Sequence, residues 1–160
     1  MATTYEPIAT TTLGSAAASV TFNSFSGYTD LVLVCVATTA LDDQFLSIRF
    51  NGDSGSNYSN TYMTGDGNNA TSGRNSNSTV AYIAGSSSNT VPVSSITQIQ
   101  NYSNSTTYKT LLSRTNDSSL LVQATVSLWR STSAITSLVI ASNGNISSNS
   151  TFTLYGIKAA

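Results

Sequence analysis

The sequence predicts an all-β protein of about eight to ten strands, folded as an antiparallel sandwich or barrel. Short apolar runs recur along the chain between clusters of Gly, Asn and Ser, a pattern typical of strands joined by turns. Val, Ile, Thr, Tyr and Phe fill these runs, whereas Glu and Lys, which favour helices, are scarce. With 39% hydrophobic residues, the chain has enough apolar area to form a core.

The expected strands follow the apolar runs in chain order. They lie at residues 17–22, 29–38, 45–50, 79–84, 95–102, 109–115, 120–130, 136–142 and 151–158, with a weaker strand at 58–63. Leu46, Ile48 and Phe50 alternate with polar residues, and so does every second residue from Val122 to Leu128. Because neighbouring residues of a strand point to opposite faces, each of these apolar sets is expected to face the core.

The run 31–36 differs from the others because it is apolar at every position, including Cys35. Both faces of this strand are therefore expected to be covered. The cover is either another layer of the same chain or a neighbouring copy of the protein. As the chain has one cysteine, it forms no internal disulfide, and Cys35 is expected to act as a small buried apolar residue.

Two domain regions are expected: an extended N-terminal arm at residues 1–16 and a single β-sandwich domain at residues 17–160. The arm shows weak periodicity and contains Pro7. Such arms either fray or lie across a partner, which makes Tyr5 and Ile8 candidate contacts with a partner.

The segment 51–77 is nearly free of aliphatic residues and rich in turn formers, so it is expected to be a long loop or a hairpin with a wide loop. Loops on a rigid sheet often carry recognition, and Tyr58, Tyr62 and Arg74 are the candidate contacts here. A flexible, solvated loop without a binding role remains the alternative.

No catalytic residues are predicted. The chain contains no histidine, which removes the most common general base and the usual nitrogen ligand of zinc. Cys35 lies in an apolar run, unlike a reactive thiolate. Asp42 and Asp43 are the only adjacent acids, and they are expected to form a solvated turn between strands rather than a hydrolytic pair.

Neither a cofactor nor a metal is expected. The segment 51–57 places oxygen-bearing side chains at alternate positions, as calcium loops do, but it has one carboxylate and lacks the terminal Glu of such loops. The Asn-Gly and Ser-Gly pairs are expected to form turns instead.

Charge and hydropathy limit the class of partner. The net charge is −1, only 8% of residues are charged, and the six basic residues are scattered, so a nucleic-acid partner is not expected. No apolar stretch approaches the roughly 20 residues that span a bilayer, and the start of the sequence does not read as a secretory signal. A soluble protein made in a cytoplasm is expected.

Several phrases of the sequence resemble small virion proteins of tailed phages. They are TTYEPIATTTLGSAAASVTF (3–22), YTDLVLV (28–34), RFNGDSGSNYS (49–59), NYSNSTTYKTLLSR (101–114) and STFTLYGIKAA (150–160). The resemblance extends over nearly the whole chain. It implies a β-sandwich of jelly-roll type, carried on the capsid as a decoration or cement protein or on the tail as a fibre.

Two functions are therefore expected, neither of them enzymatic. The first is a capsid decoration protein, a homotrimer on the virion surface that binds the major capsid protein and stabilises contacts between capsomers. The second is a tail fibre or receptor-binding protein, whose Tyr- and Asn-rich loops contact glycans of the host surface.

Overall fold

The computed structural model describes residues 4–117 and 121–158, which form an antiparallel β-sandwich without helices. Its strands are β1 (Tyr5–Thr12), β2 (Ala17–Asn23), β3 (Asp30–Ala37), β4 (Gln44–Phe50), β5 (Tyr58–Gly65), β6 (Ala70–Ser78), β7 (Ala81–Ser87), β8 (Val93–Ile99), β9 (Lys109–Asp117), β10 (Val122–Trp129), β11 (Ser137–Ile146) and β12 (Thr151–Ile157). The predicted fold class is confirmed, although these twelve strands exceed the eight to ten expected.

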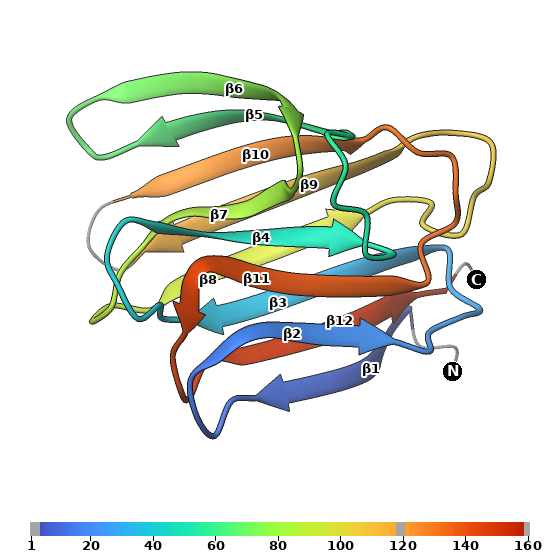
Figure 1. The fold of residues 1–160 in the computed structure, drawn as a ribbon, viewed down its shortest axis with the longest axis horizontal. Coiled ribbons are helices and arrows are strands. Elements are labelled where there is room, and N and C mark those ends of the chain that lie inside the picture. Colours follow the sequence, from blue (N-terminus) through green and yellow to red (C-terminus); the bar gives the residue numbers. More distant parts are fainter. Residues whose placement is uncertain (1–3, 118–120, 159–160) are drawn as a thin grey trace.

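The strands form a large and a small sheet that pack face to face (Figure 1). The large sheet has eight strands in the order β1-β12-β3-β8-β9-β10-β5-β6, and the small sheet has four in the order β2-β11-β4-β7. At one end the β5–β6 hairpin extends the large sheet beyond the small one (Figure 1). This order of strands does not confirm the jelly-roll type.

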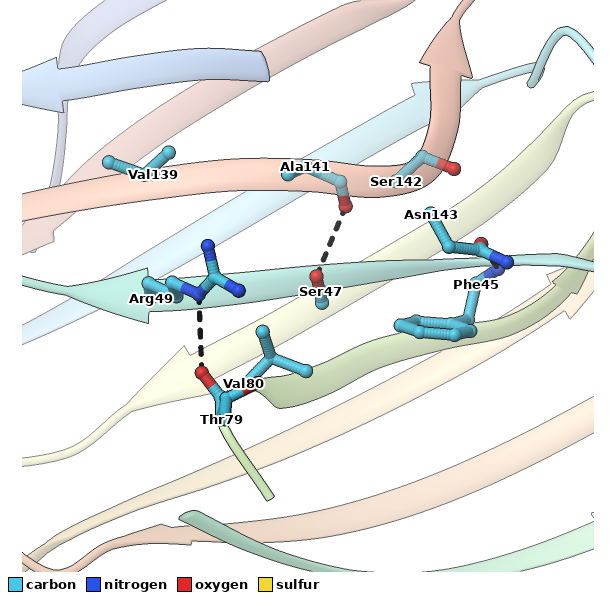
Figure 2. Close-up of a pocket in the computed structure, with 9 residues that line it drawn as sticks. All are labelled: Phe45, Ser47, Arg49, Thr79, Val80, Val139, Ala141, Ser142 and Asn143. Carbon is cyan, nitrogen blue, oxygen red and sulfur yellow. Dashed lines mark hydrogen bonds between the residues drawn. The ribbon is translucent and has the colours of Figure 1, made fainter. Parts of the chain in front are cut away.

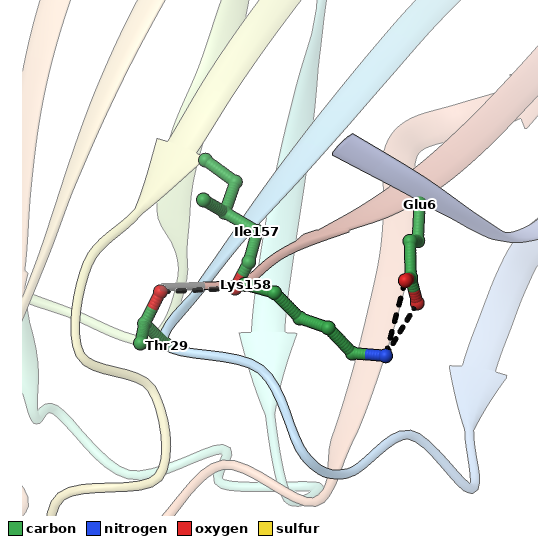
Figure 3. Close-up of polar contacts among 4 residues, drawn as sticks. All are labelled: Glu6, Thr29, Ile157 and Lys158. Carbon is green, nitrogen blue, oxygen red and sulfur yellow. Dashed lines mark hydrogen bonds and ion pairs between the residues drawn. The ribbon is translucent and has the colours of Figure 1, made fainter. Parts of the chain in front are cut away.

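The expected N-terminal arm is part of the sandwich, because residues 5–12 form edge strand β1, which pairs with β12. The register shifts between Pro7 and Ala9, where proline has no N–H to offer the ladder. Lys158 bonds Glu6 at 2.8 Å, and the Thr29 hydroxyl donates to the Ile157 carbonyl at 2.9 Å (Figure 3). These contacts fasten both ends of the described chain to the large sheet.

Most of the segment 51–77 forms a hairpin of β5 and β6, but without the wide loop that was expected. Strand β5 confirms the weak strand at 58–63, and β6 was not predicted because it contains no large apolar residue. The turn between them is tight: the Asp66 carboxylate accepts bonds from the backbone N–H groups of Asn68 (2.9 Å) and Asn69 (2.6 Å), and Gly67 has a φ of 85°. These two hydrogen bonds lower the pKa of Asp66, that from Asn69 having the larger effect.

An aromatic cluster fills one end of the core between the two sheets. Phe50, Tyr58 and Trp129 are buried, with the rings of Phe50 and Trp129 5.3 Å apart between centroids. The Tyr58 hydroxyl accepts a bond from the Phe50 backbone N–H at 3.0 Å. Burial raises the pKa of Tyr58 to about 12.

Candidate functional site

Strand β10 is inverted relative to a normal sandwich over most of its length, because Thr125 and Ser127 face the core whereas Val122, Ala124 and Val126 face outward. Strands β8 and β9 are mixed: apolar Val93, Ile99 and Leu111 are buried on the inner face together with hydroxyls. The buried hydroxyl residues of the three strands are Ser95, Thr97, Ser113, Thr115, Thr125 and Ser127. The prediction for 122–128 was therefore wrong: Val122 and Val126 are 59% and 52% exposed, and Leu128 is half-buried on the same outer face.

The edge of strand β7 explains part of the buried hydroxyls, whereas the hydroxyls of Thr97 and Ser113 bond each other at 2.9 Å. This strand is the edge of the small sheet, so the backbone groups on its free side have no neighbouring strand to bond. The hydroxyls of Ser95 and Thr115 donate to the Ile83 carbonyl at 2.7 and 2.9 Å. Such bonds satisfy the free edge, and polar residues are needed on the inner face of the large sheet to make them.

Amide side chains of the large sheet complete the same edge. Asn60 accepts a bond from the Tyr82 backbone N–H at 2.9 Å and donates to the Val80 carbonyl at 3.1 Å. The side-chain oxygen of Gln123 accepts from the Gly85 N–H at 2.8 Å. No buried side-chain nitrogen or oxygen in the described part of the chain lacks a partner.

The opposite side of the large sheet, which we call the outer face, carries many apolar residues interspersed with polar ones such as Ser94, Gln98 and Asn116. Its apolar residues include Val34, Val36, Met63, Ile96, Leu112, Val122, Ala124 and Val126, and Arg114 lies among them. Met63 is the most exposed of these apolar residues, at 66%. Exposed apolar residues are ordinary one at a time, but a group of them spread over five neighbouring strands is typical of an interaction site.

Arg114 lies in the middle of the outer face. Strand pairing aligns Val34, Ile96, Arg114, Ala124 and Met63 in one row across β3, β8, β9, β10 and β5. Arg114 also lines three shallow depressions on this face, of about 420, 330 and 360 Å³.

The guanidinium of Arg114 is exposed and has no ion-pair partner among the carboxylates whose side chains the structure describes. Arg114 lies between the apolar Ile96 and Ala124 of the neighbouring strands. A positive charge in such a place attracts a carboxylate, because their bidentate hydrogen bonds strengthen as water is excluded.

The predicted contact residues lie in different places. Tyr5 is 54% exposed and borders the depression that Arg114 shares with Val32 and Tyr155. Ile8 is partly buried against the core.

Of the three hairpin candidates, Tyr58 is fully buried, which leaves no side-chain surface for a partner. Tyr62 is half-buried and Arg74 is exposed, and they lie on different strands of the hairpin in adjacent rows of paired residues. Neighbouring residues of a strand face opposite ways, and Tyr62 pairs with Gly73 whereas Arg74 pairs with Thr61, so the two side chains lie on opposite faces. The prediction did not identify the outer face or Arg114, although apolar residues at alternate positions of 122–128 were its visible signal.

The run 31–36 is fully covered on one face and partly on the other. Leu31, Leu33 and Cys35 are completely buried between the sheets, and burial raises the pKa of the Cys35 thiol. On the other face Val32 is buried and Val34 is half-buried, but Val36 is 45% exposed. Cover of this exposed end by a neighbouring copy, one of the two alternatives expected, stays a prediction.

The segment 51–57 begins with a turn, as expected for Asn51-Gly52, and Asp53 is hydrogen-bonded within the segment. Partial burial by itself raises the pKa of Asp53, but hydrogen bonds from Trp129, Asn57 and Gly55 outweigh it and hold the pKa below its usual value. The shortest of them comes from the Trp129 indole N–H at 2.7 Å. The described residues contain no cluster of three or more Cys, Asp or Glu side chains that could bind a metal ion.

A separate depression of about 220 Å³ lies on the outer side of the small sheet (Figure 2). Arg49 and Ser47 line it from β4, each tied by a hydrogen bond: Arg49 donates to the Thr79 carbonyl at 3.2 Å, and Ser47 donates to the Ala141 carbonyl at 3.3 Å. The ring of Phe45 lies at the end of this depression beside Asn143 (Figure 2).

The described residues include no helix long and apolar enough to cross a membrane. Comparison of the sequence with protein-family models and with curated proteins finds no match.

Proposed function

We propose that this protein is a non-enzymatic structural component of a tailed-phage particle that docks on the capsid through its outer face and cements contacts between capsomers. The observation that carries the proposal is the group of exposed apolar side chains on the outer face, among them Val122, Val126 and Leu112. Burying such side chains stabilises an assembly by about 25 cal/mol for each Å² of apolar surface removed from water.

The position of Arg114 favours a different chain as the occupant of this face. In a two-fold contact centred on Arg114, the same residue of both copies would meet, and two guanidinium groups would repel each other. A capsid surface that presents a carboxylate among apolar side chains would instead pair with Arg114. The expected homotrimer would then form through other surfaces. Analytical ultracentrifugation of the purified protein would measure its oligomeric state.

The experiment is a co-sedimentation assay with capsids that lack this protein. We expect the native chain to sediment with the capsids, and Val126→Lys or Arg114→Glu to reduce the bound fraction at least tenfold. Thr21→Lys is the matched control, because Thr21 is an exposed strand residue of the small sheet. Failure of the native chain to bind, or unchanged binding by both outer-face variants, would contradict the proposal.

A further inference from the structure

A further pocket, which we call the aromatic pocket, lies where the β5–β6 hairpin meets the small sheet. It measures about 280 Å³, and its walls come from five strands. The residues that line it are Phe45, Tyr62, Asn75, Tyr82, Gly85 and Gln123. Phe45 separates it from the depression of Figure 2, which the same ring also lines.

The aromatic rings are held in place by the backbone around them. Phe45 and Tyr82 pack at 4.8 Å between centroids, and both are half-buried, as is Tyr62. Tyr62 lies across Gly73, where a Cβ atom would come within 2.5 Å of the Tyr62 hydroxyl. Glycine is therefore required at position 73 for this ring to adopt its position.

Two amides at the pocket are also fixed by hydrogen bonds. Asn75 donates to the Tyr82 hydroxyl at 3.0 Å. Gln123 accepts from the Gly85 N–H and donates to the Thr64 hydroxyl at 3.3 Å. A Cβ atom on Gly85 would lie 2.5 Å from the Gln123 side-chain oxygen, so this glycine makes room for the amide.

These bonds leave several polar groups free to bind a ligand. The Tyr62 hydroxyl has no partner among the side chains that the structure describes, and the Tyr82 hydroxyl can still donate its hydrogen. The Asn75 side-chain oxygen can accept, since the bond to Tyr82 uses the amide nitrogen. The pocket thus combines aromatic surface with hydrogen-bond donors and acceptors, and no charged side chain lines it.

From this combination we propose that the aromatic pocket binds an uncharged saccharide ring. One face of such a ring carries C–H groups that pack on aromatic side chains, while its hydroxyls both donate and accept hydrogen bonds. A charged ligand would lose its hydration without gaining an opposite charge. The volume lies just below the ~300 Å³ of the smallest typical ligand pockets, which suits a single ring. This site is separate from the outer face and does not depend on capsid docking.

The test uses the full-length protein and methyl glycosides of glucose, galactose, mannose and N-acetylglucosamine. We expect at least one of them to bind with a millimolar Kd and to shift the backbone amide NMR signals of Gly85 and Gly73. At about 50 mM sugar, some fifty times a Kd of about 1 mM, the site would be almost saturated. If none of the four sugars shifts these signals at that concentration, the proposal is overturned.

Variants separate specific binding at the pocket from general effects. Tyr62→Ala is expected to weaken binding at least tenfold, and Tyr62→Phe and Asn75→Ala by several-fold, whereas Tyr108→Phe, a control at an exposed tyrosine elsewhere, leaves it unchanged. If Tyr62→Ala does not fold, the two milder variants decide the question, because they keep the ring or alter only an exposed side chain. Unchanged affinity in both would overturn the assignment to this pocket.

Discussion

The two faces of strand β10 in the large sheet reverse the usual rule for sandwiches. Thr125 and Ser127 are buried on its inner face, whereas Val122 and Val126 are more than half exposed on its outer face. Part of the polar inner face of the large sheet serves the free edge of β7, as the bonds of Ser95 and Thr115 to the Ile83 carbonyl show. Burial alone therefore does not decide where apolar residues lie: an unpaired backbone edge can require polar side chains in the core.

The largest expected effect is in the aromatic end of the core. Phe50→Ala should lower the free energy of unfolding by roughly 3 to 5 kcal/mol, because Phe50 is fully buried against Tyr58 and Trp129. Leu128→Ala should cost less than about 1.5 kcal/mol, because Leu128 is half-buried on the outer face. Urea denaturation of both variants measures the difference, and equal losses would mean that the two faces are assigned incorrectly.

The next effect tests the hydroxyls beneath β7. Thr115→Val keeps the shape of the side chain but leaves the buried Ile83 carbonyl with one donor fewer, which should cost about 1 to 3 kcal/mol. Thr110→Val on the same strand is the matched control, because Thr110 is exposed, and its effect should stay within about 0.5 kcal/mol. Thermal unfolding compares the pair; a harmless Thr115→Val would remove the explanation for the polar inner face.

A smaller effect is expected at alkaline pH from Tyr58. In the unfolded chain Tyr58 loses its proton near the ordinary tyrosine pKa of 10.0, whereas burial keeps it protonated in the folded protein up to about pH 12. The unfolded state then binds fewer protons, so stability should fall as the pH rises from about 10 to 12. Tyr58→Phe should show a shallower fall over this window, and parallel stability curves for the two proteins would contradict the prediction.

The smallest effect on folding is expected on the outer face. Replacing Val122 and Val126 together by Thr keeps branched side chains that suit a strand, and both positions are more than half exposed. The free energy of unfolding should change by less than about 0.5 kcal/mol for each substitution. A much larger loss by chemical denaturation would show that these valines support the isolated fold and are not reserved for a partner.

Much of the fold could be predicted from the sequence, because most strands carry β-branched and aromatic residues between clear turns. Strand β6 could not, since Ala70–Ser78 has no large apolar residue and gains its structure by pairing with β5. The N-terminal strand was predicted to be an extended arm because its strand partner, β12, lies at the opposite end of the chain. Such distant pairing leaves no local pattern.

The candidate site was harder to predict than the fold. Alternation identified the apolar residues from Val122 to Leu128 but not the side they face, because a strand pattern has the same period in either orientation. The orientation depends on what packs against the strand, here in part the edge of β7. Lys109 is a similar case: it is fully buried and donates to the Thr107 and Thr132 carbonyls, and desolvation lowers its pKa, although the sequence suggests a solvated lysine.

The most direct test of the docking proposal is an image, at side-chain resolution, of the phage particle to which we propose that this chain belongs. We expect density for this chain on the capsid, with the outer face covered by another chain and a carboxylate beside Arg114. An outer face open to solvent on the particle would contradict the docking proposal. Density for this chain at the tip of a tail fibre would contradict capsid cementing and support the receptor-binding alternative.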